Sequence, residues 1–509
     1  MKKNDFLIAG TTTLYSILFY HQSAGLNFFL FSIALCILLF INFREQAHSI
    51  KWKLAAAGTL LSGFSVYYLD NSLTVWSNLL SLALLSAFTF EPRTSVITAW
   101  CYSAFTLFTS IGFMVVDLIA RNNPGTNSVP KKRIGLLAIL LPIFIILVFF
   151  LLYRDGNALF YDFTKNINLE FISVSWVCFT TGGFFLMYSF FCYRTIPELL
   201  EPESRIPDKL DAGRTAPAWW RNLLPLSQEY FSGLILLIAL NLLTLVLNLL
   251  DCKFLFLDGK LPAGITYSQF VHTGVGTLIF SIVVAILVVL FYFRAELNFG
   301  KGKKVLAWLT YAWIAQNVFM LYSGALKNGM YIHEYTLTYR RIGVYVWLLL
   351  ALFGLVTTAI KIYRTRTNYF LFRVNAWLCY GSLVIAALFN WDRSIAEYNI
   401  RYSKKVDYPY LISLSYNTFP SILEAFREGR MKNEQIPYDP SEDFLDTRNE
   451  PNKSVSAYLG EELAAFLDRQ SLSQWQSACI SKQLVEAELR ASVGKIKSDK
   501  QIVTYIQNR

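Results

Sequence analysis

One uncharged stretch of twenty residues decides the fold class of this chain. Residues 231–250 are Phe-Ser-Gly-Leu-Ile-Leu-Leu-Ile-Ala-Leu-Asn-Leu-Leu-Thr-Leu-Val-Leu-Asn-Leu-Leu. A helix needs about 20 consecutive, mostly apolar residues to cross the hydrocarbon core of a bilayer. The whole chain of 509 residues agrees with this stretch, since 54% of it is hydrophobic and only 16% is charged. We therefore predict an all-α fold, a polytopic transmembrane helical bundle that is embedded in the lipid bilayer.

Further apolar runs of similar length extend this pattern and predict eleven transmembrane spans in all. A twelfth run, Ser95 to Ala120, is long enough to cross but carries Asp117 and many Ser and Thr residues. If this run does not cross fully, most Lys and Arg of the loops fall on the cytoplasmic side, as the positive-inside rule requires. We therefore predict an interfacial or re-entrant segment there, with the N-terminus inside and the C-terminal region outside. The eleven spans are Phe6 to Tyr20, Leu26 to Phe43, Leu54 to Leu69, Leu73 to Phe90, Ile134 to Tyr153, Phe171 to Tyr193, Phe231 to Leu250, Phe270 to Phe293, Val305 to Tyr322, Ile342 to Tyr363 and Phe370 to Phe389.

The net charge of +11 raises the question of an anionic partner. Its distribution gives the answer, because the excess of Lys and Arg lies before residue 390, in short loops between apolar runs. The positive-inside rule produces this pattern without any anionic partner. We therefore predict no nucleic acid as a partner.

The composition divides the chain into three predicted domains. Residues 1–230 form an N-terminal membrane bundle, 231–390 a membrane core, and 391–509 an extracytoplasmic helical tail of ordinary soluble composition. In the tail, Pro437, Pro440 and Pro451 predict a linker from Met431 to Ser454. Helices are predicted at Leu411 to Arg430, at Val455 to Arg469, and from the capping-box pair Ser471 and Gln474 onward. The apolar residues of the last two helices predict a core: Leu459, Leu463, Phe466, Leu467, and less regularly Leu472, Trp475, Cys479, Leu484, Leu489 and Val493.

Few strongly polar side chains lie within the predicted spans. Coupled transporters normally keep ionisable residues at mid-span, and this chain has almost none, so coupled transport is disfavoured while a facilitator for neutral solutes is not. The amides within the spans are expected to form hydrogen bonds between helices. They are Asn241, Asn248, Gln316, Asn317 and Asn375.

Chemically useful side chains gather in the predicted outer loop from Lys327 to Arg341. His333 and Glu334 resemble half of a zinc motif, but no second histidine follows at the spacing of HExxH, so we predict neither a metal nor a cofactor. Arg340 and Arg341 lie outside against the positive-inside rule, which indicates a local reason. They either pair with Glu334, Asp392 or Asp407 to hold the tail against the membrane region, or bind an anionic headgroup or ligand through the planar guanidinium.

Four motifs together carry a family resemblance: residues 267–274 (Tyr-Ser-Gln-Phe-Val-His-Thr-Gly), 331–343, 371–377 and 390–399. In this order they resemble a bacterial family of polytopic inner-membrane proteins, in its Bacteroidetes-type variant, that is known only as a domain of unknown function. The resemblance covers Phe231 to Pro420 and implies an inner-membrane location but no reaction. Thr336 replaces a glycine that the family usually has, and Asn417-Thr418 replaces Asp-Ala.

These observations favour a non-enzymatic inner-membrane protein whose outer loops and tail bind an envelope ligand, an anionic lipid or a partner protein, in signalling or assembly. The first alternative is a membrane-embedded enzyme acting on an envelope lipid or carrier, with His272, His333 or Asp392 as acid or base. The second is the facilitator. The candidate ligand-binding residues are His272, His333, Glu334, Tyr335, Tyr339, Arg340, Arg341, Asn390, Asp392, Asn399 and Asp407.

Overall fold

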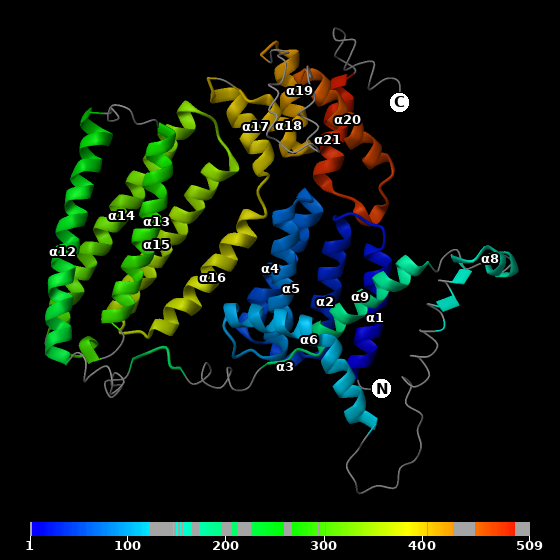
Figure 1. Ribbon diagram of the computed structural model, residues 1–509, viewed down its shortest axis with the longest axis horizontal. Coiled ribbons are helices and arrows are strands. Elements are labelled where there is room, and N and C mark those ends of the chain that lie inside the picture. The colour runs from blue at the N-terminus through cyan, green and yellow to red at the C-terminus, as the bar shows by residue number, and fades with distance from the viewer. Residues whose placement is uncertain are drawn as a thin grey trace, which may run out of the picture. The chain divides into compact units, whose positions relative to one another are not determined.

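The computed structural model confirms the all-α prediction (Figure 1). It describes residues 3–122, 146, 149–150, 153–154, 156–164, 173–195, 206–210, 225–258, 267–293, 296–300, 302–404, 406–430 and 454–493. Over these ranges every regular element is a helix, and an isolated β bridge joins Lys209 to Arg366. The predicted linker at Met431 to Ser454, apart from Ser454 itself, and most of the span predicted at Ile134 to Tyr153 lie outside the described residues.

Seven described helices are long and apolar enough to cross a membrane, where the sequence predicts eleven spans. Six of the seven coincide with predicted spans. Two further predicted spans are shorter apolar helices, Leu26–Asn42 and Phe280–Tyr292. The seven are Ser72–Phe90, Val96–Met114, Val174–Phe191, Leu226–Leu257, Lys303–Glu334, Tyr339–Tyr363 and Asn368–Ala386.

The remaining one of the seven, Val96–Met114, falls on the segment that the sequence predicts to be interfacial or re-entrant. Helix α6 (Val96–Asn122) is continuous over 27 residues, so the described chain does not turn back within it. Asp117, which made this segment doubtful, accepts hydrogen bonds from Tyr188 at 2.6 Å and from Arg194 at 2.7 Å. A paired carboxylate is less costly to place near a membrane than an isolated one. The interfacial orientation stays a prediction.

The chain forms two compact units, and the first consists of Met1–Ser204 with Leu472–Ile480. Its helices α2, α4 and α5 pack through small polar residues. Asn78 donates to Ser32 Oγ at 2.9 Å, to Ser62 Oγ at 3.2 Å and to the Thr59 carbonyl at 3.1 Å. A Cβ on Gly63 would lie 2.8 Å from Ser32 Oγ, so this approach requires glycine. The helices are α1 (Lys3–Phe19), α2 (Leu26–Asn42), α3 (Arg44–Ala47), α4 (Ile50–Leu69), α5 (Ser72–Phe90), α6, α8 (Ala158–Thr164) and α9 (Val174–Phe191).

The segment Leu472–Ile480 corrects the capping-box prediction. Ser471 ends α20 (Val455–Ser471), and Gln474 precedes a short 3-10 helix, Trp475–Ser477, so that α21 begins only at Ile480. The segment bonds to the first unit instead: the Leu26 amide donates to the Ala478 carbonyl at 2.8 Å. Long-range pairing therefore overrides the local capping signal.

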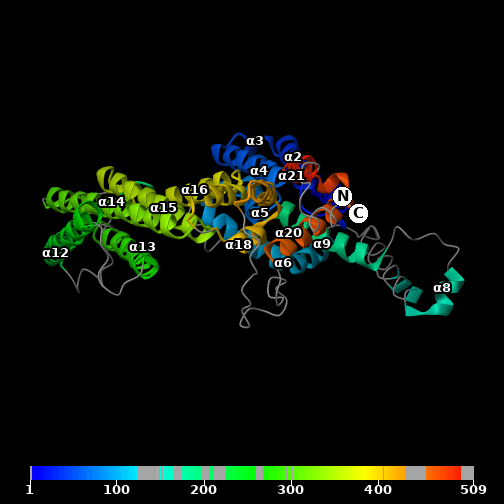
Figure 2. The same ribbon diagram turned by 90° about the horizontal axis from the view of Figure 1, so that it is seen from above.

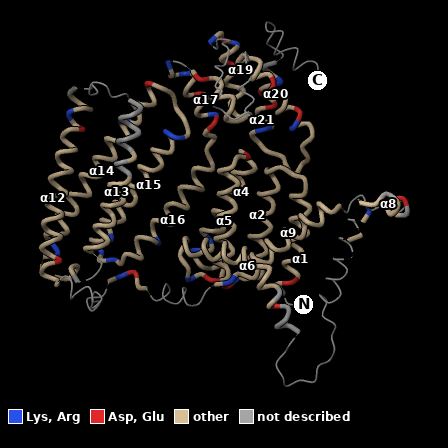
Figure 3. Tube along the Cα trace, in the orientation of Figure 1, with Lys and Arg blue, Asp and Glu red and all other residues tan. Residues whose placement is uncertain are grey.

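The described residues of the second unit, Arg205–Ser471 with Ser481–Arg509, include five long helices. Both views show them side by side, and their charged residues lie near the helix ends (Figures 1, 2 and 3). A core that includes Leu237, Leu306 and Leu355 joins the first four of them. The helices are α12 (Leu226–Cys252, continued by a π-helix, Lys253–Asp258), α13 (Tyr267–Tyr292), α14 (Lys303–Glu334), α15 (Tyr339–Tyr363) and α16 (Asn368–Ala386).

Polar side chains link α12 to α14, as the sequence predicts. Gln316 donates to Asn241 Oδ1 at 2.8 Å, and Asn248 donates to the Gln316 carbonyl at 3.1 Å. Thr244 Oγ accepts from the indole of Trp313 at 3.1 Å. The amide of Asn317 differs, because it bonds within its own helix. The five linked residues form one polar stripe along the α12–α14 interface.

Replacing Thr244 by valine is expected to destabilise the α12–α14 pair. The change keeps the shape of the side chain but leaves the buried Trp313 indole N–H without its acceptor, at a cost of about 1–3 kcal/mol. Thr13→Val is a matched control, since its exposed hydroxyl bonds only to the carbonyl of Ala9 in the same helix. Unfolding in lipid–detergent micelles titrated with dodecyl sulfate measures both. Equal stabilities for the two variants would contradict the interhelical role.

The tail helices surround a core of their own. Leu459, Leu463 and Phe466 are buried in it, which confirms the predicted stripe of α20. Of the less regular continuation, Cys479 and Leu489 are buried, whereas Leu472, Trp475 and Leu484 are exposed, so the prediction is wrong at these three positions. The tail helices are α17 (Trp391–Tyr402), α18 (Tyr408–Leu414), a 3-10 turn (Tyr416–Thr418), α19 (Phe419–Arg427), α20 and α21 (Ile480–Val493). The core residues are Ile395, Ala396, Tyr408, Leu411, Ile412, Phe419, Ile422, Leu423, Ala425, Val455, Tyr458, Leu459, Leu463, Phe466, Val485 and Leu489.

The single helix predicted at Leu411 to Arg430 is wrong. The chain is extended at Ser415, with φ −170° and ψ 170°, between α18 and the 3-10 turn. There the Ser415 hydroxyl donates to Asp392 Oδ2 at 2.7 Å. The break therefore brings a hydroxyl to a buried carboxylate of α17, an interaction that no local pattern in the sequence indicates.

Candidate functional site

The predicted outer loop from Lys327 to Arg341 is shorter than expected. Helix α14 continues to Glu334 and α15 begins at Tyr339, so the α14–α15 turn consists of residues 335–338. Lys327 lies within α14 and pairs with Asp251 of α12 at 2.6 Å. The side chain of Leu337 packs against the tail core. The turn is thus the place where the long helices of this unit contact the tail.

Asp392, at the start of α17, uses both carboxylate oxygens. Oδ1 accepts from the Tyr339 hydroxyl at 2.6 Å and Oδ2 from the Ser415 hydroxyl at 2.7 Å. The residue is 6% exposed. Hydrogen bonds to an ionised group are stronger than those between neutral groups, and a carboxylate at a helix N-terminus is further stabilised by the helix dipole. Asp392 therefore joins α15, α17 and the Ser415 break.

Asn399, two turns later in α17, bonds to both backbone groups of one residue in the turn. The Leu337 amide donates to Asn399 Oδ1 at 2.6 Å, and Asn399 Nδ2 donates to the Leu337 carbonyl at 2.9 Å. Asn399 is 1% exposed. A primary amide is the one side-chain group that can donate and accept side by side in this way. We call the bonds of Asp392 and Asn399 to the α14–α15 turn region, through Tyr339 and Leu337, the clamp.

Asn390 and Asp407 begin tail helices. The side chain of Asn390 accepts from the Arg393 amide at 3.1 Å and donates to Asn417 Oδ1 at 3.2 Å. Asp407 accepts from the Tyr410 amide at 3.1 Å. Both are N-cap interactions, in which a side chain satisfies an amide that the helix leaves without a partner. The two residues thus fix where α17 and α18 start.

Of the two alternatives for Arg340 and Arg341, pairing with Glu334, Asp392 or Asp407 is wrong, whereas binding of an anionic group stays a prediction. Arg341 lies over the rings of Tyr331, at 4.1 Å, and Tyr335, at 5.7 Å, and donates to the Thr336 carbonyl. Arg340 is exposed and forms no ion pair with a described residue. Glu334, which was a predicted arginine partner, pairs with Lys404 at 2.9 Å.

The two histidines differ in what the structure describes. His333 has a 70% exposed side chain, with Nδ1 3.9 Å from Glu334 Oε1. His272 lies in α13, but its side chain is outside the described part of the chain. Among the described residues, no group of three or more His, Cys, Asp and Glu side chains is placed to hold a metal ion. Thr336 is not among the described residues with positive φ, so threonine meets no backbone strain where the family usually has glycine.

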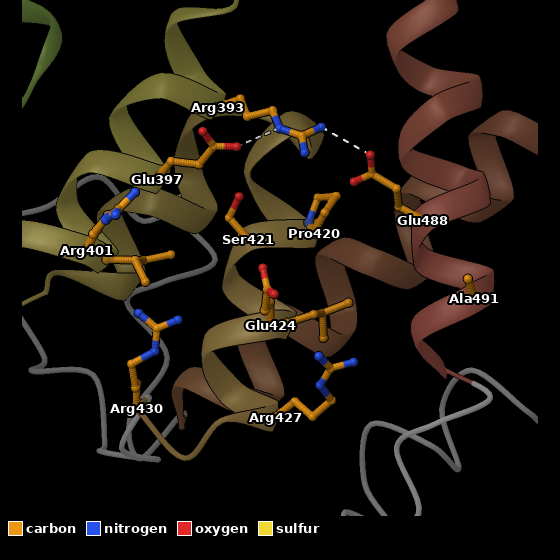
Figure 4. A pocket seen from close by; sticks show the side chains of 12 residues that line it. Arg393, Glu397, Arg401, Pro420, Ser421, Glu424, Arg427, Arg430, Glu488 and Ala491 are labelled. Atoms are coloured by element: carbon orange, nitrogen blue, oxygen red, sulfur yellow. Dashed lines mark hydrogen bonds and ion pairs between the residues drawn. The ribbon is translucent and has the colours of Figure 1, made fainter.

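A charged cavity in the tail was not predicted from the sequence. It has a volume of about 630 Å³ and lies between α17, α19 and α21 (Figure 4). Its lining is dominated by arginines and glutamates. The lining residues are Arg393, Glu397, Ile400, Arg401, Pro420, Ser421, Leu423, Glu424, Arg427, Arg430, Glu488 and Ala491.

One arginine of the cavity is held by carboxylates on both sides. Arg393 donates from Nε to Glu397 at 2.8 Å and from Nη1 to Glu488 of α21 at 3.2 Å. The hydrogen bond that Arg393 donates to Glu397, together with the one to Glu488, holds the pKa of the Arg393 guanidinium above its ordinary value. The pair Arg393–Glu488 also joins two walls of the cavity.

A sequence signal for this cavity does exist. Arg393, Glu397 and Arg401 follow one another at intervals of four residues, which places them on one face of α17. Glu424 and Arg427 share a face of α19 in the same way. The usual interpretation of such patterns is a solvated helix face, and only the tertiary structure brings the two faces together.

Comparison with known proteins gives one match. A model of the family described as "Domain of unknown function (DUF4153)" matches residues 7–425. No curated protein and no solved structure matches the chain. The match confirms the resemblance seen in the four motifs. That resemblance covers Phe231 to Pro420, and the family model covers the N-terminal helices as well. The chain belongs to the DUF4153 family, a family of unknown function.

Proposed function

We propose that this membrane protein acts without chemistry, as a multi-pass protein of the bacterial inner membrane whose tail lies on the outer face and binds an envelope ligand or partner. In this account the tail receives the ligand and the clamp passes its state to the long helices, in signalling or assembly. The observation that carries the proposal is the clamp itself. Its two tail residues, Asp392 and Asn399, are buried and bond to the α14–α15 turn region.

The clamp suits transmission because it cannot slide by small steps. Moving the tail relative to the turn would leave the backbone groups of Leu337 and the carboxylate of Asp392 without partners. Buried polar groups without partners are costly, so the junction favours discrete arrangements over gradual ones. A ligand that bound one arrangement better than another would shift their populations.

The occupied groups also favour binding over catalysis. Asp392 is one of the three candidate acids or bases of the enzymatic alternative, beside His272 and His333, yet both of its oxygens accept hydrogen bonds from neighbouring hydroxyls. A general base needs an oxygen within reach of the proton that it abstracts. The exposed residues that stay available for a ligand at the turn are His333, Tyr335 and Arg340.

Labelling from outside the cell tests the proposed orientation. Ser413 lies on the exposed side of α18, so Ser413→Cys in a cysteine-free background offers a thiol on the tail. We expect a membrane-impermeant maleimide to label it in intact spheroplasts as fully as after lysis. Labelling that appears only after lysis would place the tail inside and contradict the proposal.

Native mass spectrometry tests the binding role. The full chain, extracted without denaturation, is expected to retain a bound species, whether a lipid, a small anion or a protein. Arg340→Ala then tells whether the α14–α15 turn contributes to holding it. Spectra that contain only this chain, from several mild extraction conditions, would contradict a stable ligand.

A further inference from the structure

Four arginines face one cavity in the tail: Arg393 and Arg401 of α17, Arg427 of α19, and Arg430 from the chain just beyond α19. Figure 4 shows Arg393 at one end of the cavity, between Glu397 and Glu488, and Arg427 and Arg430 at the other end. Arg401 lies on the α17 side of the same cavity. We propose that this cavity binds a small phosphate-bearing anion. This inference rests on the proposed function, because it names the ligand class and the site of the binding tail.

The positive charge in this cavity is only partly compensated. Arg401 and Arg427 form no ion pair with any described residue, whereas Arg430 pairs with Glu428 outside the cavity. Arg393 lies between two carboxylates, Glu397 and Glu488, and Glu424 is the third carboxylate of the lining. The lining thus carries four arginines and three glutamates, which leaves a surplus of one positive charge.

The arrangement of the guanidinium groups favours phosphate over carboxylate. A single arginine fork satisfies both oxygens of a planar carboxylate. Phosphate presents oxygens in several directions, so it gains from arginines that approach from different elements. Here Arg401 comes from α17, Arg427 from α19 and Arg430 from the chain just beyond α19. The volume of about 630 Å³ lies within the ordinary range of small-molecule sites.

The walls of the cavity are fixed by the tail core. Ile422 and Leu423 of α19 are 0% and 1% exposed, and they anchor the helix that carries Ser421, Glu424 and Arg427. The Arg393 bridge ties α17 to α21. The ligand would therefore meet a preformed site, which lowers the entropic cost of binding.

Replacing Glu424 is expected to change the affinity for phosphate in the opposite direction from replacing an arginine. Its carboxylate points into the cavity beside Arg427 (Figure 4), so it repels an anion bound there. Glu424→Gln removes this repulsion and is expected to strengthen phosphate binding about two- to fivefold, the modest effect of one charge near solvent. Arg427→Gln removes a donor and is expected to weaken binding roughly tenfold.

Titration of the full-length protein in phosphatidylcholine nanodiscs tests these expectations, with inorganic pyrophosphate as the probe and calorimetry as the readout. Arg490→Gln is the matched control: it removes the same charge from the tail, but Arg490 pairs with Glu486 on α21 and does not line the cavity. Phosphatidylglycerol nanodiscs form the second arm. Pyrophosphate binding that is blocked there identifies a lipid headgroup as the source of phosphate, and unchanged binding identifies a free anion. Both outcomes support the site.

Three results would overturn the proposal: no pyrophosphate binding by the wild-type protein, equal losses in Arg427→Gln and Arg490→Gln, or weaker binding in Glu424→Gln. Circular dichroism and the melting temperature of each variant exclude misfolding as the cause. Failure here leaves the orientation and native-mass tests untouched, so a tail that binds another ligand is distinguishable from a tail that binds none.

Discussion

Replacing Asn399 by alanine is expected to release the α14–α15 turn from the tail and lower the free energy of unfolding of the tail by about 2–4 kcal/mol. The side chain of Asn399 is the partner of both the amide and the carbonyl of Leu337. Alanine replaces neither bond, so both backbone groups lose their protein partners. Chemical unfolding in micelles, followed by hydrogen exchange of peptides from the tail, measures the change.

Ser394→Ala is the control for this experiment. Ser394 lies on the exposed side of the same helix, and its hydroxyl bonds only to the Asn390 carbonyl of its own helical turn. Exposed substitutions of this kind usually change stability by less than about 0.5 kcal/mol. An Asn399→Ala variant no less stable than Ser394→Ala would show that the turn is not held by this amide.

The second large effect is expected at Asp392. Asp392→Ala removes the acceptor of two hydroxyl groups, from Tyr339 and Ser415, and should cost about 2–4 kcal/mol because bonds to a charged acceptor are the stronger ones. Asp392→Asn keeps one good acceptor and should cost less. The Tyr339→Phe and Asp392→Ala double-mutant cycle isolates the bond between helices, with an expected coupling of about 1–2 kcal/mol.

Asp407 provides the comparison for Asp392. Its carboxylate is an exposed N-cap of α18, and loss of such a cap costs typically about 1 kcal/mol. We therefore expect Asp392→Ala to lower the free energy of unfolding clearly more than Asp407→Ala does. Equal losses of stability would show that Asp392 acts only as a helix cap. A coupling energy near zero with Tyr339 would show that the hydrogen bond between α15 and α17 does not contribute to the clamp.

The sequence predicts the all-α class and the position of six of the seven apolar helices because their signal is local. A run such as residues 231–250 needs no partner to be recognised, and the amides Asn241 and Gln316 pair between helices as expected. The break at Ser415 could not be predicted in this way. It depends on a carboxylate 23 residues away in the sequence, and a continuous apolar pattern covers it.

The candidate site shows the same division. Tyr339, Asp392 and Asn399 were identified as chemically important, but as ligand contacts, since the sequence does not tell which polar groups satisfy one another. The cavity was missed because Arg401 and Arg427 belong to helices whose packing follows from the shared core and not from either pattern. The role of a polar residue thus depends on its tertiary partner, whereas an apolar run can be recognised from the sequence alone.

Hydrogen exchange at the α14–α15 turn reports directly on the clamp. Peptides that span residues 335–338 are compared between the wild-type protein in nanodiscs and the Asn399→Ala variant. We expect the Leu337 amide to be protected in the wild-type protein and to exchange rapidly in the variant, while the amides inside α14 keep their protection. A Leu337 amide that exchanges in the wild-type protein at the rate of a free peptide would contradict the clamp, and with it the coupling of the tail to the membrane helices.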